Sequence, residues 1–264
     1  MALLAAVASG CGSGEESQSS GKGGESSAPD PKSDGRLMSQ SLKELKGYRS
    51  ARLQSSAHDL RGDRDGNCAG KTEKAPFAFT EVIAQRGERA WIRLDDEMLK
   101  QYRQLATVIG PEQVAKYEPA AEKARGKWIE LTPSEMKDDE TLRLCDLDRG
   151  FASIPESVES AKRLNPGTTR YEARDKPEEK LIPLVQQPED DGVTVYLSVK
   201  GGTAPQAIEF EIDDEPVSLT LSEVDKPVKV VPPQPSEIVP SADVADLYPD
   251  PEVMRKREQQ NQEP

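Results

Sequence analysis

Residues 192–222 read GVTVYLSVKGGTAPQAIEFEIDDEPVSLTLS, and this stretch carries the clearest structural signal in the chain. Apolar residues take every second position in three runs, 193–199, 208–212 and 217–221, which is the period of a strand with one buried face. The links between the runs are short, whereas a parallel crossover needs about a dozen residues or more. The sequence therefore predicts three sequential antiparallel strands with one apolar face.

The rest of residues 37–230 alternates between strand and helix patterns. The turn sequence at 62–67 predicts a hairpin. Asp95 is expected to cap an amphipathic helix, and a second helix is expected to begin at Pro111 and to be interrupted by Pro119. Together these elements predict an α+β domain, in which helices inserted between the middle strands cover the apolar face of a meandering antiparallel sheet.

The composition argues against several functional classes. The chain has 264 residues, and 35 Lys and Arg against 48 Asp and Glu give a net charge of −13. Binding to nucleic acid depends on clustered basic residues, so nucleic acid is not an expected partner. The single histidine, His58, and three cysteines leave few groups for a His-based dyad or a four-ligand zinc site. We therefore expect no catalytic residue, no metal and no cofactor, and we do not expect an enzyme.

The N-terminal segment, residues 1–10, is a short apolar run of small residues that ends at Cys11. It resembles the end of a bacterial lipoprotein signal peptide, in which the cysteine after the small residues receives the lipid. The run lacks the basic segment and the full length of a secretory signal. Two alternatives follow: the true start lies upstream of Met1, or the chain is not exported. We expect lipidation at Cys11, against the alternative of an incidental cysteine.

Two polar segments flank the expected domain. Residues 11–36 comprise the lipidated cysteine and a disordered tether, because residues 12–36 are rich in Gly, Ser, Glu, Asp, Pro and Lys. Residues 231–264 are rich in Pro, acidic and amide residues and are expected to be mostly disordered. The low hydrophobic fraction, 34%, agrees with a core diluted by such tails.

The other two cysteines, Cys68 and Cys145, are expected to form a disulfide. Exported proteins meet oxidising conditions, and these two thiols remain after Cys11 is assigned to lipid. The alternative is a pair of buried thiols.

Several segments resemble the LolA-like family, and more closely its LppX/LprG group of envelope lipoproteins. The resemblance rests on the lipid-attachment segment and tether, the strand with Trp91, the strand at 126–131, Val193-Thr-Val-Tyr196 and the segment at 226–232. It implies that residues 37–230 form a LolA-like domain, a curved antiparallel half-β-barrel whose concave apolar face is covered by helices. It also implies an apolar cavity that binds acylated lipids and the absence of catalytic residues.

The candidate ligand-binding residues are apolar or aromatic residues of the expected strands and helix. They are Phe77, Phe79, Ile92, Leu94, Met98, Tyr102, Leu105, Ile129, Leu131, Val195, Leu197, Ile208 and Phe210. The alternative for each of them is ordinary packing in the core.

The sequence thus favours a lipoprotein that binds or carries a lipid or another hydrophobic molecule in an apolar cavity. Its expected place is the outer face of the bacterial cell membrane, where an N-terminal lipid anchors a monomer that can also meet envelope proteins. The alternative is a non-catalytic interaction or sensing lipoprotein of the same fold with a filled core.

Overall fold

A computed structural model describes residues 31–248 apart from 74–78, 167–179, 188–191 and 213–214. The expected signal segment, Cys11 and most of the expected tether lie outside the described residues, as do the last part of the tail and Phe77. Among the helices that are described, none combines the length and the apolar character needed to cross a bilayer.

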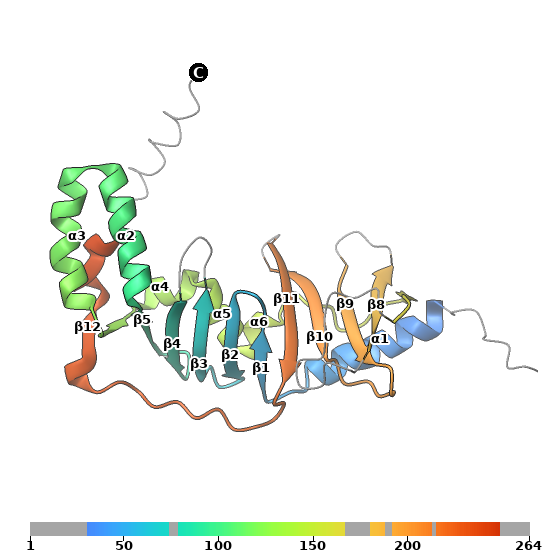
Figure 1. Cartoon of the computed structure of the whole chain (residues 1–264). Coiled ribbons are helices and arrows are strands. Elements are labelled where there is room, and N and C mark those ends of the chain that lie inside the picture. The colour runs from blue at the N-terminus through green and yellow to red at the C-terminus, as the bar shows by residue number, and fades with distance from the viewer. Residues whose placement is uncertain (1–30, 74–78, 167–179, 188–191, 213–214, 249–264) are drawn as a thin grey trace, which may run out of the picture.

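The described strands form a single sheet of twelve strands (Figure 1). They are β1 (Ser50–Gln54), β2 (His58–Asp63), β3 (Cys68–Glu73), β4 (Phe79–Gln85), β5 (Arg89–Leu94), β6 (Trp128–Glu130), β7 (Ser160–Arg163), β8 (Leu181–Gln187), β9 (Thr194–Ser198), β10 (Ala207–Ile212), β11 (Glu215–Ser222) and β12 (Ile238–Pro240). Their order is β12-β6-β5-β4-β3-β2-β1-β11-β10-β9-β8-β7. Every pair is antiparallel except β12 with β6, which is parallel.

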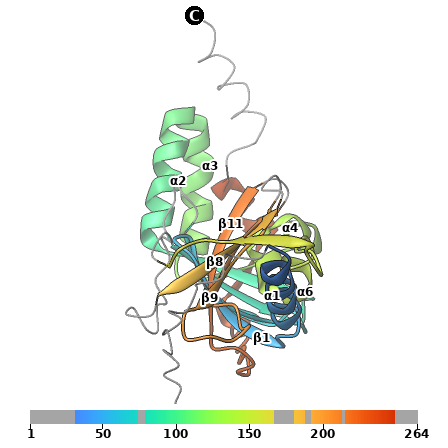
Figure 2. The ribbon, with the colours of Figure 1, turned by 90° about the vertical axis from the view of Figure 1, so that its right-hand side faces the viewer.

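The helices occupy two places. They are α1 (Pro31–Leu45), α2 (Asp96–Ile109), α3 (Pro111–Ala124), α4 (Pro133–Asp138), α5 (Glu140–Cys145) and α6 (Leu147–Gly150), with the 3-10 segments η1 (Pro235–Glu237) and η2 (Ser241–Leu247). Helices α1, α4, α5 and α6 lie along one face of the sheet, whereas α2 and α3 form a hairpin that stands beyond one end of it (Figures 1 and 2). The predicted α+β class, a largely antiparallel sheet covered by helices, is confirmed.

The three strands predicted from residues 192–222 are β9, β10 and β11, and they pair sequentially as expected. Ile208 of β10 lies opposite Val195 of β9 and Leu219 of β11, so their side chains share one face. All three residues are fully buried. The two-residue period therefore identified both the strands and the face that enters the core.

The buried residues form two main groups. The larger core lies under the central and β8–β11 parts of the sheet and receives Met38, Leu42 and Leu45 from α1. The smaller core joins α2, α3, β6 and η2, and includes Val244 and Leu247. One sheet therefore contributes to both cores. Its β5–β6 end, nearest the α2–α3 hairpin, contributes to the smaller core.

The predicted disulfide between Cys68 of β3 and Cys145 at the end of α5 is present, with its two Cα atoms 5.2 Å apart. Both residues are buried in the larger core. A Cβ atom added to Gly62 of β2 would lie 2.3 Å from the carbonyl oxygen of Cys145. The helical segment that carries Cys145 therefore lies directly against the backbone of the sheet.

The N-terminal boundary predicted at residue 37 is wrong. Helix α1 begins at Pro31, so residues 31–36 are helical and are not part of a disordered tether. Asp34 in the first turn is 3% exposed, and its Oδ1 accepts hydrogen bonds from Arg163 Nη2 at 2.6 Å and Nε at 3.1 Å. The polar composition of this turn concealed a contact with β7, about 130 residues away in sequence.

The prediction of disorder is also wrong for the first half of the tail. Residues 238–240 form β12 beside β6, and Val244 and Leu247 are buried in the smaller core. Val244 and Leu247, three residues apart, anchor this segment because they pack against side chains of α3 in the smaller core. Pro119 also differs from expectation, since α3 continues through it to Ala124.

The Asp34–Arg163 pair predicts an asymmetry between its two deletions. Arg163→Ala leaves a buried carboxylate unpaired, and we expect a loss of about 2 kcal/mol in the free energy of unfolding. Asp34→Ala leaves an arginine that is 43% exposed and can be solvated, so we expect about 1 kcal/mol. Urea denaturation of both variants measures this. Equal losses would show that an unpaired carboxylate at this buried position costs no more than an unpaired, partly solvated arginine.

Candidate functional site

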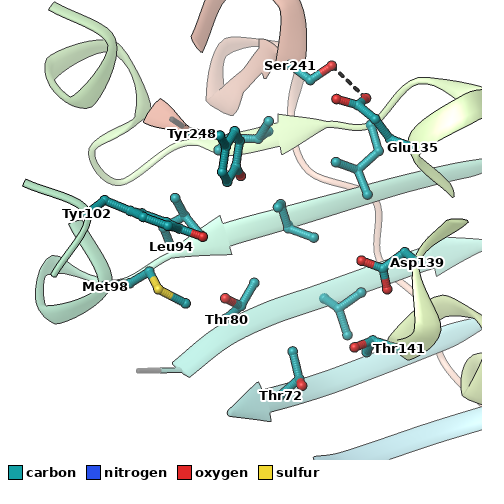
Figure 3. Close-up of a pocket in the computed structure, with 14 residues that line it drawn as sticks. Thr72, Thr80, Leu94, Met98, Tyr102, Glu135, Asp139, Thr141, Ser241 and Tyr248 are labelled. Carbon is teal, nitrogen blue, oxygen red and sulfur yellow. Dashed lines mark hydrogen bonds between the residues drawn. The ribbon is translucent and has the colours of Figure 1, made fainter. Parts of the chain in front are cut away.

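A pocket of about 410 Å³ lies between the two cores, over strands β3 to β6 (Figure 3). Its walls come from the ends of helices on either side. The start of α2 borders it at one end, and α4 with the start of α5 borders it at the other. Residues of η2 and its C-terminal neighbour complete it. The pocket exists because the helices of the larger core and those of the smaller core do not meet over this part of the sheet.

Most of the floor is apolar. It is formed by Val82, Ile92, Leu94, Met98, Ile129 and Leu131. The inward positions of β5, which alternate with Arg89, Trp91 and Arg93 on the other face, supply Ile92 and Leu94. A pocket of this size, apolar with a few polar groups, is at the lower end of the range of roughly 300 to 1,000 Å³ typical of small-molecule sites.

Two tyrosines stand at the end of the pocket near α2. Tyr102 and Tyr248 contact each other edge to face, with ring centroids 5.4 Å apart. Burial raises the pKa of the Tyr102 phenol, and the neighbouring Tyr117 raises it further. Burial likewise raises the pKa of Tyr248, with further contributions from Tyr102, Glu135 and Asp139. Both phenols are therefore neutral over the physiological range and offer hydroxyl groups.

Two carboxylates stand at the other end. Glu135 is held by the capping box of α4, where its Oε2 accepts a hydrogen bond from the Thr132 N–H at 2.6 Å, and from the Ser241 hydroxyl at 2.8 Å. Asp139 caps α5, and its Oδ1 accepts from the Leu142 N–H at 3.0 Å. Both side chains are thus fixed by backbone groups at helix starts, which is where carboxylates are favoured.

The carboxyl group of Glu135 has a pKa below its ordinary value. Partial burial alone would raise this pKa, but hydrogen bonds with the backbone and side chain of Thr132 and with Ser241 stabilise the charged form and outweigh burial. Glu135 is therefore ionised at neutral pH.

The structure brings six of the candidate ligand-binding residues together at this pocket: Ile92, Leu94, Met98, Tyr102, Ile129 and Leu131. Four others, Val195, Leu197, Ile208 and Phe210, do not line it and are packed in the larger core. Leu105 is half-buried on α2 and does not line the pocket either. Phe77 lies outside the described residues, and the side chain of Phe79 is not described.

The sequence analysis missed the polar half of the lining: Thr72, Thr80, Glu135, Asp139, Thr141, Ser241 and Tyr248. A signal existed for Thr80, which occupies the same inward alternation as Val82 on β4. The capping box at 132–135 placed Glu135 at the start of a helix, but it did not indicate that the Glu135 carboxylate lines a pocket. Ser241 and Tyr248 were missed because they lie in the segment predicted to be disordered.

Groups of three or more His, Cys, Asp or Glu side chains arranged to hold a metal ion are absent from the described part of the chain. No protein-family model matches the sequence, and no curated protein matches it at a significant level.

The fold is similar to two solved structures. LprF from Mycobacterium bovis matches 78% of this chain and 99% of its own, with 14% identity and a TM-score of 0.47. The lipoprotein LppX from Mycobacterium tuberculosis matches 75% of this chain and 98% of its own, with 13% identity and a TM-score of 0.39.

Proposed function

We propose that this chain binds a small lipid-like molecule in the pocket over β3 to β6, with the apolar part of the ligand on the floor. The observation that carries the proposal is the set of six apolar side chains converging on a space of about 410 Å³. Removing a methylene group from water is worth about 0.8 kcal/mol, so an acyl chain of modest length gains several kcal/mol in such a site.

The proposal includes the membrane attachment inferred from the sequence. Lipid on Cys11, followed by a tether that now ends before Pro31, would hold the domain at the outer face of the membrane. The domain itself extends from α1 to η2, because both elements contribute to the cores. No step of this proposal requires a catalytic residue, a metal or a cofactor.

A second candidate function is a non-catalytic interaction or sensing module. It is favoured by the filled core beneath β9 and β10, where Val195 and Ile208 are fully buried and pack against other side chains. The pocket that contains the predicted lining residues therefore lies over β3 to β6 and not over β9 and β10. The binding experiment below separates the two candidates, because an interaction module does not require the pocket.

The test fills the pocket with a larger side chain. In Ile92→Trp, an indole replaces a half-buried side chain of the floor, and we expect the purified full-length chain to lose at least tenfold in affinity for the neutral fluorescent probe N-phenyl-1-naphthylamine. The control is Ile83→Trp, which makes the same exchange on β4 at a residue of the opposite face. We expect this control to bind the probe like the wild type.

Two results would contradict the proposal. If the wild-type chain does not bind the probe, the pocket does not accept apolar molecules. If both tryptophan variants lose affinity equally, or if neither does, the probe binds elsewhere.

A further inference from the structure

The two ends of the pocket differ in chemistry. In Figure 3, Leu94, Met98 and Tyr102 lie together near α2, while Glu135 lies beside Ser241 and Asp139 lies beside Thr141, on the side of α4 and α5. A ligand that satisfies both ends must be amphipathic, with its polar group beside Asp139 and Thr141. Its apolar part then follows the floor toward Met98.

Each carboxylate keeps one oxygen for a ligand. Glu135 uses Oε2 for Thr132 and Ser241, and Asp139 uses Oδ1 for Leu142. Among the described residues, none donates a hydrogen bond to Glu135 Oε1 or to Asp139 Oδ2. An ionised carboxylate only accepts hydrogen bonds, so both oxygens are open to a donor, that of the exposed Glu135 to water as well as to a ligand and that of the half-buried Asp139 from the pocket.

Two hydroxyl groups provide an independent sign of a ligand. Thr141 is 3% exposed and Thr80 is 9% exposed, and both line the pocket. Figure 3 shows both hydroxyls turned toward the space rather than into the protein. Within the described part of the chain, neither hydroxyl makes a hydrogen bond to the protein, and neither oxygen is among the fully buried unpaired atoms, so both can be reached from the pocket.

The charge at this end is negative and is not balanced within the pocket. Among the described residues, the lining contains no Lys, Arg or His. The phenol of Tyr248 senses the same field, since after burial and Tyr102 the charges of Glu135 and Asp139 contribute to its raised pKa. A carboxylate or phosphate placed here would meet two like charges and no cation, whereas an ammonium group would meet two counter-charges.

We propose that the pocket selects an amphipathic ligand whose polar end is a protonated amine and excludes ligands whose polar end is a carboxylate or a phosphate. The amine donates hydrogen bonds to Asp139 Oδ2 and the Thr141 hydroxyl, Glu135 adds a second negative charge to the same end of the pocket, and the hydrocarbon part lies on the floor. This inference rests on the proposed function, because it names the headgroup of the same ligand.

The test compares three ligands with the same hydrocarbon chain as competitors of N-phenyl-1-naphthylamine on the full-length chain. They are dodecylamine, dodecan-1-ol and dodecanoate, each kept below its micelle concentration. We expect dodecylamine to bind at least tenfold more tightly than dodecanoate, with the alcohol between them. Butylamine, which has the head but little tail, should not compete, and this separates an amphiphile from a free amine.

The outcomes distinguish the two proposals. If dodecanoate competes as well as dodecylamine or better, the headgroup inference is overturned and the proposed function stands. Strong competition by butylamine would overturn the amphipathic ligand. If the probe itself does not bind, both proposals fall.

A substitution at Asp139 tests whether this residue causes the preference for an amine headgroup. Asp139→Asn removes the charge while asparagine remains a good cap for α5, and we expect it to lower the dodecylamine affinity at least threefold and leave dodecan-1-ol unchanged. The control is Asp65→Asn, which removes one charge from the exposed turn between β2 and β3. An equal effect of both variants would attribute the preference to net charge rather than to the pocket.

Discussion

Replacing both disulfide cysteines, as Cys68→Ala with Cys145→Ala, is expected to lower the free energy of unfolding by about 4.5 kcal/mol. The bond closes a loop of 77 residues, and the entropy that such a loop removes from the unfolded chain is worth about this much in the chain-entropy model. Alanine is the appropriate replacement because both positions are buried in the larger core, where a serine hydroxyl would require a partner. Guanidinium unfolding followed by circular dichroism measures the change.

The reduced wild-type chain is the matched control for this variant. It retains both sulfur atoms and lacks only the covalent bond, so we expect its loss of stability to approach that of the double variant. A loss below about 1 kcal/mol in both would show that the unfolded chain is already constrained over this loop. A large loss in the variant alone would assign the effect to packing of the sulfur atoms.

The second large effect is expected for Leu53→Ala in the centre of the sheet. Leu53 of β1 is fully buried and lies opposite Leu60 of β2 and Leu221 of β11. Removing its side chain leaves a cavity between two neighbouring strands whose backbones cannot approach each other, and we expect a loss of about 3 to 4 kcal/mol in the free energy of unfolding. Urea denaturation, with the slope checked for two-state behaviour, measures this loss.

Val231→Ala is the control for this truncation. Val231 is 75% exposed, and we expect a change within about 0.5 kcal/mol. A loss at Leu53 that is no larger than the loss at Val231 would contradict the assignment of β1 to the centre of the larger core.

The fold was predictable where local patterns and tertiary packing agree. The alternation at 193–199 fixed β9 and its inward face, because Val195 lies opposite Ile208 of β10 and Leu184 of β8, and Leu197 lies opposite Ile182 of β8. The cap at Asp95 was predictable because it depends on a hydrogen bond only three residues away, from Met98 N to Asp95 Oδ1 at 2.7 Å.

The elements that were missed depend on partners far away in sequence. The first turn of α1 is polar, and it is held by Arg163 of β7. Strand β12 is only three residues long, and its order depends on β6, more than a hundred residues earlier. Neither contact has a local signature. The predicted interruption of α3 at Pro119 was wrong. The helix continues through this proline and is held by its packing against α2 and η2.

For the candidate site, the sequence revealed the apolar floor but not which apolar residues leave space. Ile92 and Ile208 both occupy inward strand positions, yet one faces the pocket and the other is fully packed. The difference is set by which helices cover each part of the sheet, and alternation along a strand carries no information about this. Five members of the polar lining were missed for the same reason, since Glu135, Asp139 and Thr141 come from helix starts and Ser241 and Tyr248 from the tail.

The wall that includes Ser241 and Tyr248 has a consequence for when the site can be occupied. A ribosome adds these residues after those of every other wall, and also after β12. A growing chain thus presents an open trough rather than a pocket. The binding proposed above therefore requires a chain that has folded as far as Tyr248.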